Sequence, residues 1–486
     1  MTGRLTLGDL SPEAHASGAA ARAVTGVALD SRRVAPGDVF FALPGTRADG
    51  MAFVAQALAA GAAAVVGEGD RPDALGRDVA YVRVSDVRRA LALAAARVHP
   101  RQPETIVAVT GTSGKTSVAD FARQIFAALG ARSASVGTLG IITSEGAAYG
   151  SLTTPDPLTL HATLDRLAGE GVTHLAMEAS SHGLDQRRLD GVRLVAGAFT
   201  NLGRDHLDYH ADEEEYLAAK ARLFEALLPD GAPAVVNLDG DRAHDIQRVA
   251  LARGLRVLAV GEVGEAIRLA KLSPDGFGQV LDLVAEGRAM QVRLPLVGRF
   301  QVENALVAAA LVAATGAPVT EAIAAIAGLK GVPGRLEAVG EARGALAIVD
   351  YAHKPEALAA VLDTLRPYAS GRLVLVMGCG GDRDRGKRAI MGRIAATRAD
   401  LVHVTDDNPR TEDPAAIRAE ILAAAPGAIE IGDRREAIRA AVRELRTGDV
   451  LVVAGKGHET GQIVGDTTLP FSDHDEIRAA FREFAA

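Results

Sequence analysis

The stretch TIVAVTGTSGKTS, residues 105–117, constrains the fold of this 486-residue chain more than any other segment. An apolar run typical of a buried strand ends in a glycine-rich turn, and helix-forming sequence follows. In such a strand–loop–helix unit, the loop N–H groups and the helix N-terminus together bind phosphate. The stretch therefore predicts an α/β fold in which a nucleotide binds at the carboxyl ends of parallel strands.

Each part of this loop has a predicted role in binding ATP. Lys115 is placed to reach the β- and γ-phosphates, and the Thr116 hydroxyl is placed to bind Mg²⁺. The strict phosphate-loop pattern fails, because it has a further glycine where this chain has Val109. A Gly/Ser turn with an incidental lysine is the alternative interpretation. The candidate ATP-binding residues of the loop are Gly111, Thr112, Ser113, Gly114, Lys115, Thr116 and Ser117.

The rest of the chain repeats the alternation of apolar runs and amphipathic stretches. Examples are HLAMEAS, AGAFTNLG, ALAIVDYA, RLVLVMGCGG and DVLVVAGKG. This rhythm is typical of βαβ units, and the prolines of HPRQPE (99–104) indicate a linker. We predict an α/β protein of three domains: residues 1–102, a central phosphate-loop ATPase-like domain with a mostly parallel sheet at 103–334, and a Rossmann-like α/β domain at 335–486.

Composition excludes several classes of function. The chain has 53 Lys and Arg against 61 Asp and Glu, a formal charge of −8, which argues against general binding to nucleic acid. The single cysteine, Cys379, allows no intrachain disulfide and favours a reducing compartment. No signal-peptide pattern and no run of 18 apolar residues is present, so we expect a cytoplasmic protein without membrane insertion.

Three further side chains of the central region are candidates for a metal site. Glu178 ends an apolar run, where a carboxylate can hold a divalent cation; an ordinary capped turn is the alternative. His206 lies among acidic residues, which suits either a ligand or a structural histidine. Lys220 lies on the apolar face of a predicted helix. Its stem can snorkel to water, or its amine can lose its charge and react with CO₂ to form a carbamate.

The motifs TGTSGKTS, MEASSHGLDQRR, TNLGRDHLDYH, VDYAHKP and GKGHE, together with the Lys220 helix, resemble the Mur ligase family over essentially the whole chain. The resemblance implies an N-terminal domain for UDP, a central domain for ATP and a C-terminal domain for the incoming amino acid. It implies an ATP- and Mg²⁺-dependent ligase of peptidoglycan precursor synthesis that works through an acyl phosphate. The expected reaction adds meso-diaminopimelate to the D-glutamate of UDP-N-acetylmuramoyl-L-alanyl-D-glutamate, and we expect a monomer. The alternatives are the same ligation with L-lysine, the next ligase of the pathway, and a phosphate-loop kinase or nucleotide switch.

The resemblance also implies roles for individual residues. The catalytic set is Lys115, Glu178, His206 and Lys220. The metal ligands are Thr116, Glu178, His206 and Lys220 as its carbamate. Additional nucleotide contacts are Asn304, Arg335 and Asp350. Two groups of residues contact the UDP-substrate. The uridine and diphosphate contacts are Leu29, Ser31, Thr46, Arg47 and Ala48, and the muramoyl-dipeptide contacts are Thr153, Thr154, Ser180, Gln186 and Arg188.

The loop DDNPR, residues 406–410, follows the apolar run Leu401–Val404, which predicts a strand. This loop indicates which amino acid is added. By the resemblance, diaminopimelate-adding members carry D-N-P-R here, and lysine-adding members lack the arginine. A guanidinium can hold the distal carboxylate of diaminopimelate with two hydrogen bonds and would repel the distal ammonium of lysine. A surface arginine paired with Asp406, Asp407 or Asp413 is the alternative. The implied diaminopimelate-binding residues are Arg383, Asp407, Asn408, Pro409, Arg410, Gly455 and Glu459.

Overall fold

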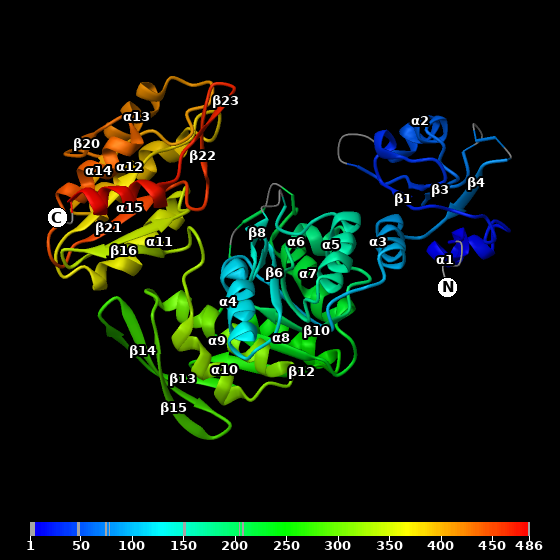
Figure 1. Ribbon diagram of the computed structural model, residues 1–486, viewed down its shortest axis with the longest axis horizontal. Helices are drawn as coiled ribbons and strands as arrows, with labels where there is room; N and C mark the ends of the chain where they lie inside the picture. Colours follow the sequence, from blue (N-terminus) through cyan, green and yellow to red (C-terminus); the bar gives the residue numbers. More distant parts are fainter. Residues whose placement is uncertain are drawn as a thin grey trace. The chain divides into compact units, whose positions relative to one another are not determined.

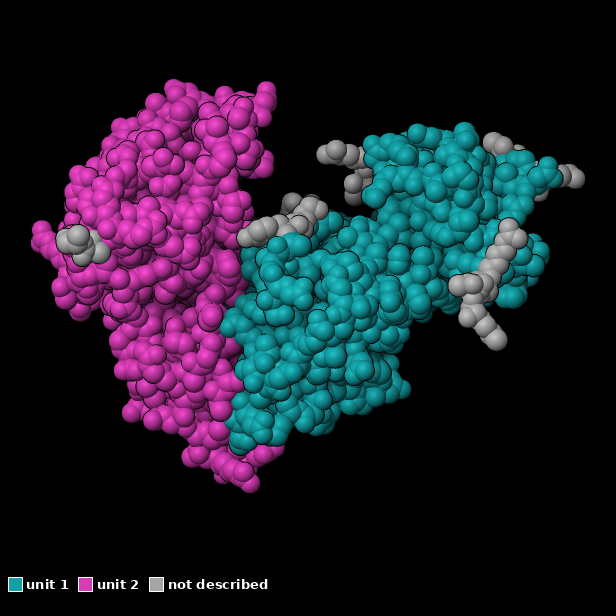
Figure 2. Space-filling view, viewed as in Figure 1, with its two compact units in different colours: residues 1–268, 306–322 teal, residues 269–305, 323–486 magenta. Residues whose placement is uncertain are grey.

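The structure is a computed structural model that describes residues 5–45, 49–72, 75–76, 78–148, 152–203, 205–206 and 209–484. It divides into two compact units (Figure 2). The first unit contains residues 1–268 and 306–322, and the second contains residues 269–305 and 323–486. The domain boundaries predicted at residues 102 and 334 stay predictions.

The N-terminal part of the first unit is a small parallel sheet with the order β1-β2-β3-β4 (Figure 1). Alternate strand residues face opposite sides, so Phe41 and Val66 join one core cluster and Phe40 and Val65 join another. Its elements are α1 (Leu7–Leu10), β1 (Val27–Ala28), β2 (Val39–Phe41), α2 (Val54–Ala59), β3 (Ala64–Gly67), β4 (Ala80–Arg83) and α3 (Val87–Val98).

The central part of the first unit is a sheet with the order β12-β11-β10-β5-β9-β6-β7-β8. Its strands from β12 to β6 are parallel, and β6, β7 and β8 are antiparallel. The elements up to residue 200 are β5 (Thr105–Thr110), α4 (Lys115–Ala128), β6 (Ser133–Gly137), β7 (Gly140–Thr143), β8 (Gly146–Ala148), α5 (Pro157–Gly169), β9 (His174–Glu178), α6 (Ser181–Asp185) and β10 (Leu194–Phe199). The later ones are α7 (Glu213–Arg222), a π-helical turn (Leu223–Leu227), β11 (Pro233–Asn237), α8 (Ala243–Ala252) and β12 (Arg256–Gly261).

This strand order determines where the site is built. The strand β5 lies between β9 and β10, and all three are parallel. Their carboxyl ends therefore meet at one edge of the sheet, which is where ligands bind in open α/β sheets. TGTSGKTS begins at the last residue of β5, EASSHG begins at the last residue of β9, and TNLG follows β10. Topology alone therefore brings three of the predicted motifs together.

The second unit contains a hairpin and a mostly parallel sheet with the order β16-β17-β21-β18-β19-β20, in which β16 is antiparallel. Helices pack on both faces of this sheet (Figure 1), and two apolar clusters separate along alternate strand residues. The elements up to residue 365 are β13 (Ile267–Asp275), which starts in the first unit, β14 (Gly278–Ala285), β15 (Arg288–Leu294), α9 (Arg299–Ala314), α10 (Val319–Ala325), β16 (Glu337–Ala342), β17 (Ala345–Asp350) and α11 (Pro355–Leu365). The others are β18 (Leu373–Met377), α12 (Gly386–Arg398), β19 (Leu401–Val404), α13 (Pro414–Leu422), β20 (Ile429–Glu430), α14 (Arg434–Arg443), β21 (Val450–Ala454), β22 (Gly461–Val464), β23 (Thr467–Pro470) and α15 (Asp473–Phe484).

The helices bear on the prediction that no segment crosses a membrane. Within the residues that the structure describes, no helix has both the length and the apolar character that crossing a bilayer requires.

Candidate active site

The predicted phosphate loop connects β5 to α4. Gly111 has a φ of +146° and Gly114 a φ of +87°, backbone conformations that favour glycine. The helix begins at Lys115, so the loop N–H groups lie at its N-terminus. The strand–loop–helix unit predicted from the sequence is confirmed as a local structure, and its geometry suits an anion.

The loop is supported by Thr200 and Asn201 from the segment after β10, two residues to which the sequence analysis assigned no individual role. The Thr200 hydroxyl donates to the carbonyl of Ser113 at 2.7 Å. The Thr112 amide donates to the carbonyl of Asn201 at 2.8 Å, and the Ser113 amide donates to Asn201 Oδ1 at 3.0 Å. A Cβ on Gly111 would lie 1.9 Å from Thr200 Oγ1. Glycine is therefore required at residue 111 both by φ and by this close approach.

Replacing Gly111 with alanine should lower the free energy of unfolding by about 2 kcal/mol and weaken the binding of ATP, because the loop must move away from Thr200. Gly130 gives a matched control at the other end of α4. Its φ is +88°, but a Cβ on Gly130 would have nothing within 4 Å, so Gly130→Ala isolates the cost of φ. Urea unfolding and ATP titration of both variants are the measurements. Equal losses in the two variants would contradict the packing argument.

Two lysines meet at one backbone carbonyl of the loop. The Nζ atoms of Lys115 and Lys220 each donate to the carbonyl of Gly111 at 2.8 Å. Lys220 is 1% exposed, and its Nζ lies 4.2 Å from the centre of the Tyr216 ring. Burial, and then the charge of Lys115, lower the pKa of Lys220 to about 6. The snorkelling interpretation is therefore wrong, and the amine is largely neutral at pH 7.

Glu178 is buried at the end of β9. One carboxylate oxygen accepts from the Thr138 amide at 2.7 Å and the other from the Thr138 hydroxyl at 3.2 Å. The Thr138 hydroxyl also lies 3.1 Å from the Thr153 hydroxyl. A Cβ on Gly137 would lie 2.1 Å from Glu178 Oε1, so the neighbouring strand end makes room for this carboxylate. Glu178 and Thr153 thus belong to one polar cluster.

The other predicted dipeptide-binding residues extend this cluster. The Thr154 hydroxyl donates to the carbonyl of Glu178 at 3.0 Å, and the Ser180 hydroxyl donates to Thr154 Oγ1 at 3.0 Å. The Arg188 guanidinium donates to the carbonyl of Thr154 at 2.6 Å and to Gln186 Oε1 at 2.8 Å. Burial lowers the pKa of Arg188 from its ordinary value. Thr154, Glu178, Ser180, Gln186 and Arg188 are thus connected at the sheet edge through side-chain and backbone groups.

His206 was predicted as a metal ligand. It has a φ of +55°, its Nε2 lies 3.6 Å from Asp205 Oδ2, and its ring lies 4.9 Å from that of His182, centre to centre. Among the described residues, no three His, Cys, Asp or Glu side chains gather as a metal-binding group. A carboxylate such as Glu178 and a hydroxyl such as Thr116 nevertheless fit Mg²⁺, because this ion keeps few protein ligands and shares oxygens with nucleotide phosphates.

The predicted uridine-site residues are only partly described. Thr46, Arg47 and Ala48 lie outside the described residues. Leu29 packs against a core cluster of the N-terminal sheet. Ser31 is buried, and its hydroxyl donates to Gln56 Oε1 at 2.9 Å. Leu29 and Ser31 therefore lie in the same small domain, where Ser31 also contacts Gln56.

The remaining predicted nucleotide contacts belong to the second unit. Asp350 ends β17, and its carboxylate accepts from the amides of Leu336 and Ala352, both at 2.8 Å. Burial raises the pKa of Asp350. The Arg335 guanidinium lies 5.2 Å from the centre of the Tyr351 ring. Asn304 lies on α9 and is 5% exposed.

Several predicted diaminopimelate-binding residues meet around a buried lysine that the sequence analysis did not assign. Lys456 is fully buried, and its Nζ donates to Asn408 Oδ1 at 3.0 Å and lies 3.3 Å from Glu459 Oε2. The Asn408 amide group donates to the same Glu459 oxygen at 2.9 Å. A Cβ on Gly455 would lie 2.5 Å from Asp407 Oδ2. The end of β19 and the segment after β21 thus form one largely buried polar cluster.

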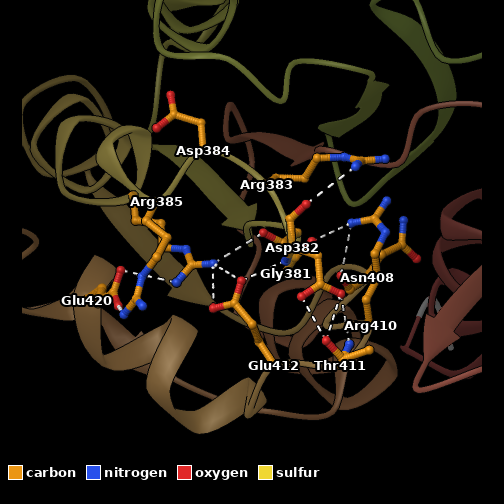
Figure 3. Close-up of polar contacts among 12 residues, drawn as sticks. Gly381, Asp382, Arg383, Asp384, Arg385, Asn408, Arg410, Thr411, Glu412 and Glu420 are labelled. Atoms are coloured by element: carbon orange, nitrogen blue, oxygen red, sulfur yellow. Dashed lines mark hydrogen bonds and ion pairs between the residues drawn. The ribbon is translucent and has the colours of Figure 1, made fainter. Parts of the chain in front are cut away.

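Arg410 and Arg383 come from the loops that follow β19 and β18 (Figure 3). Arg410 has a φ of +52°, and its Nη1 donates to the carbonyls of Gly381 at 2.8 Å and Asn408 at 3.4 Å. Its flanking acids have other partners: Asp406 pairs with Arg418, and Asp413 caps α13. Arg383 is exposed and donates to the carbonyl of Asp382 at 3.3 Å. The surface ion pairs proposed as the alternative for Arg410 are not formed among these described residues.

Comparisons with known proteins agree with this arrangement. Three family models match: Mur ligase family, catalytic domain, over residues 23–99; Mur ligase middle domain, over 109–312; and Mur ligase, glutamate ligase domain, over 334–457. A relative from Bradyrhizobium diazoefficiens is 60% identical over 465 residues, which cover 95% of each chain. The chain belongs to the Mur ligase family. That relative is named UDP-N-acetylmuramoyl-L-alanyl-D-glutamate–2,6-diaminopimelate ligase, as is one from Mesorhizobium japonicum at 58% identity over 95% of this chain and 96% of the relative.

Solved structures extend the family comparison to the fold. A structure named UDP-N-acetylmuramoyl-L-alanyl-D-glutamate–2,6-diaminopimelate ligase is 34% identical, covers 99% of both chains and has a TM-score of 0.77. A MurF structure from Acinetobacter baumannii, 21% identical, has a TM-score of 0.61 over 93% of this chain and 96% of that one, which supports the fold alone. The predicted family and the predicted α/β fold class, with N-terminal, central and C-terminal domains, are confirmed.

Proposed function

We propose that this protein is the ATP-dependent ligase that joins meso-diaminopimelate to the D-glutamate of UDP-N-acetylmuramoyl-L-alanyl-D-glutamate. The observation that carries the proposal is the near-full-length similarity to relatives that bear this name for 2,6-diaminopimelate. The phosphate loop and the Arg410 loop supply the chemical parts that such a reaction needs.

The reaction proceeds by activation of a carboxylate. A carboxylate is a poor electrophile at neutral pH, so its oxygen first attacks the γ-phosphorus of ATP. The bond to the bridging oxygen breaks, ADP leaves and an acyl phosphate forms. The diaminopimelate amine then attacks the acyl carbon, the C–O bond breaks, inorganic phosphate leaves and the nitrogen loses a proton.

In this proposal the chain's own residues bind, orient and stabilise charge. The loop amides and Lys115 bind the phosphates and stabilise the charge that develops during transfer. The network of Thr154, Gln186 and Arg188 holds the muramoyl-dipeptide beside them. Arg335 and Asp350 belong to the second unit, which also carries the proposed amino-acid site.

The proposed metal ligands are Thr116, Glu178, His206 and the carbamate of Lys220. When bound, Mg²⁺ screens the repulsion between the substrate carboxylate and the γ-phosphate. The burial of Glu178 and the lowered pKa of Lys220 support this set, because one supplies a desolvated carboxylate and the other an amine able to take up CO₂. Lys115 and His206 act in binding and positioning in this scheme, and neither is a nucleophile.

The proposed amino-acid site combines one cation with two acceptors. Arg410 would hold the distal carboxylate of diaminopimelate, and Glu459 would accept from its distal ammonium, with Asp407 nearby. The contacts of Asn408 and Glu459 with Lys456 support a preformed site. A lysine substrate would bring an ammonium toward Arg410, so the same geometry disfavours it.

Phosphate release with different amines tests the proposal. We expect ATP, Mg²⁺ and UDP-N-acetylmuramoyl-L-alanyl-D-glutamate to give phosphate with diaminopimelate at least about a hundredfold faster than with lysine, because lysine leaves the Arg410 charge unpaired and brings an ammonium toward it. Omitting the amine is the control, and it should give no sustained release. Faster release with lysine would identify the lysine-adding ligase, and a stable phosphorylated product without an amine would identify a kinase.

We also propose that the ligase is a cytoplasmic monomer whose partners are small molecules. A formal charge of −8 and a single, buried cysteine support this assignment. Light scattering coupled to gel filtration measures the mass in solution, which should equal the 50.3 kDa of one chain. A mass of twice this value would contradict the monomer.

A further inference from the structure

A fully buried arginine lies beneath the loop that carries Arg410. The guanidinium of Arg388 comes from α12, and its Nη2 contacts both carboxylate oxygens of Glu412 at 2.9 Å. Its Nη1 donates to Glu420 Oε2 at 3.1 Å. A buried guanidinium requires such compensation, and Glu412 receives a fixed position in return. Nothing in the proposed reaction uses these residues directly.

Glu412 also binds the neighbouring loop. Its Oε1 accepts from the backbone amide of Asp382 at 2.6 Å. The Asp382 carboxylate in turn accepts from the Thr411 amide at 3.1 Å and from the Thr411 hydroxyl at 2.8 Å. Asp382 has a φ of +53°, a conformation that such local hydrogen bonds must hold. Asp382 and the pair Thr411–Glu412 therefore bind each other reciprocally.

This connection determines where Arg410 lies. The carbonyl of Gly381, the residue before Asp382, accepts from Arg410 Nη1 at 2.8 Å, and its amide donates to the carbonyl of Asn408 at 2.9 Å. A Cβ on Gly381 would lie 1.9 Å from the carbonyl oxygen of Pro409, so the two loops are in direct contact. A shift of residues 381–382 would remove the acceptor that orients the Arg410 guanidinium.

We propose that Glu412 is a positioning residue for diaminopimelate: it transmits the fixed position of buried Arg388 to the 381–383 loop and, through the Gly381 carbonyl, orients Arg410. The inference rests on the proposed function. Glu412 itself touches no substrate, and it acts by fixing the two arginine-bearing loops against each other before the amino acid binds. Preorganisation of this kind lowers the cost of binding without changing the chemical step.

The test compares Michaelis constants for the three substrates. Glu412→Ala should raise the KM for diaminopimelate about tenfold and leave the other two KM values and kcat within about twofold, the pattern of a lost binding interaction. Glu412→Gln keeps an acceptor for the Asp382 amide, so it should restore part of the loss. Thr411→Val removes only the hydroxyl bond to Asp382 and leaves buried Arg388 compensated. We expect Thr411→Val to raise the KM for diaminopimelate about threefold. This variant therefore tests the inference even if Glu412→Ala folds poorly.

Glu420→Ala is the matched control. It removes the other carboxylate on Arg388, and the remaining partner of Glu420 is Arg385. If the loss of charge compensation on Arg388 were the cause, Glu420→Ala would raise the KM for diaminopimelate as much as Glu412→Ala does. Positioning through Asp382 instead predicts that Glu420→Ala has a KM for diaminopimelate close to that of the wild type. An unchanged KM in both Glu412→Ala and Thr411→Val, or an equal rise in Glu420→Ala, overturns the inference. A wild-type enzyme that does not use diaminopimelate overturns the proposed function, and the inference with it.

Discussion

Replacing Lys220 with methionine should lower kcat/KM by about a thousandfold, the loss expected when a charge-stabilising group is removed from a catalytic site. Methionine retains the apolar stem against Tyr216 but has no amine to bind the Gly111 carbonyl or to form a carbamate. Phosphate release measures the activity, and circular dichroism shows whether the fold is kept. Lys220→Arg is the matched control, since it keeps a cation and cannot be carbamylated. Full activity in either variant would contradict the proposed carbamate.

The pH dependence of the carbamate follows from the lowered pKa of Lys220. The folded protein loses the amine proton above about pH 6, whereas the unfolded chain keeps it up to about pH 10.4. The unfolded state therefore binds more protons in this window, so the contribution of Lys220 to stability rises with pH across it. ¹³C-bicarbonate NMR should show a carbamate signal at pH 8 that declines as pH falls through about 6. A signal that persists in Lys220→Met would come from another amine.

Local patterns were sufficient to predict the elements that carry the chemistry. The strand, turn and helix around the phosphate loop follow from contiguous residues, and β19 ends at Val404 before DDNPR as the apolar run predicts. Helical spacing placed Lys220 on an apolar face, but it left two outcomes open. Burial and the contact with the Gly111 carbonyl exclude snorkelling, and both depend on a loop more than 100 residues away. Carbamylation of Lys220 stays a prediction.

Contacts between distant segments were not visible in the sequence. Thr200 and Asn201 support the phosphate loop because β5 and β10 are neighbours, an order that no local pattern encodes. Buried Lys456 reads as an ordinary lysine in GKGHE, and it becomes part of the site only because β19 and β21 both end beside β18. Proline in DDNPR indicates a restricted turn, but it does not predict the left-handed conformation of Arg410.

The charged residues of DDNPRTEDP, residues 406–414, have different structural roles, which explains the unusual charge of this segment. Asp406 and Asp413 hold the surrounding scaffold, since one pairs with Arg418 and the other caps α13. Glu412 joins the scaffold to the 381–383 loop. The Arg410 side chain contacts two backbone carbonyls through Nη1, and these contacts orient the guanidinium that the proposed ligand carboxylate would bind.

Replacing Arg410 with alanine should therefore raise the KM for diaminopimelate by about a hundredfold or more, because the distal carboxylate loses a bidentate, charge-assisted partner. The KM values for ATP and the UDP-substrate should change by less than about twofold, since Arg410 contacts neither in the proposed site. Arg410→Lys keeps the charge but lacks the planar guanidinium. Its KM for diaminopimelate should lie between those of the wild type and Arg410→Ala. Arg418→Ala, which removes the partner of neighbouring Asp406, controls for general loosening of the loop. If the KM for diaminopimelate of Arg410→Ala equals that of the wild type, Arg410 does not select the amino acid. If Arg418→Ala raises this KM as much as Arg410→Ala does, the effect comes from a general loosening of the loop.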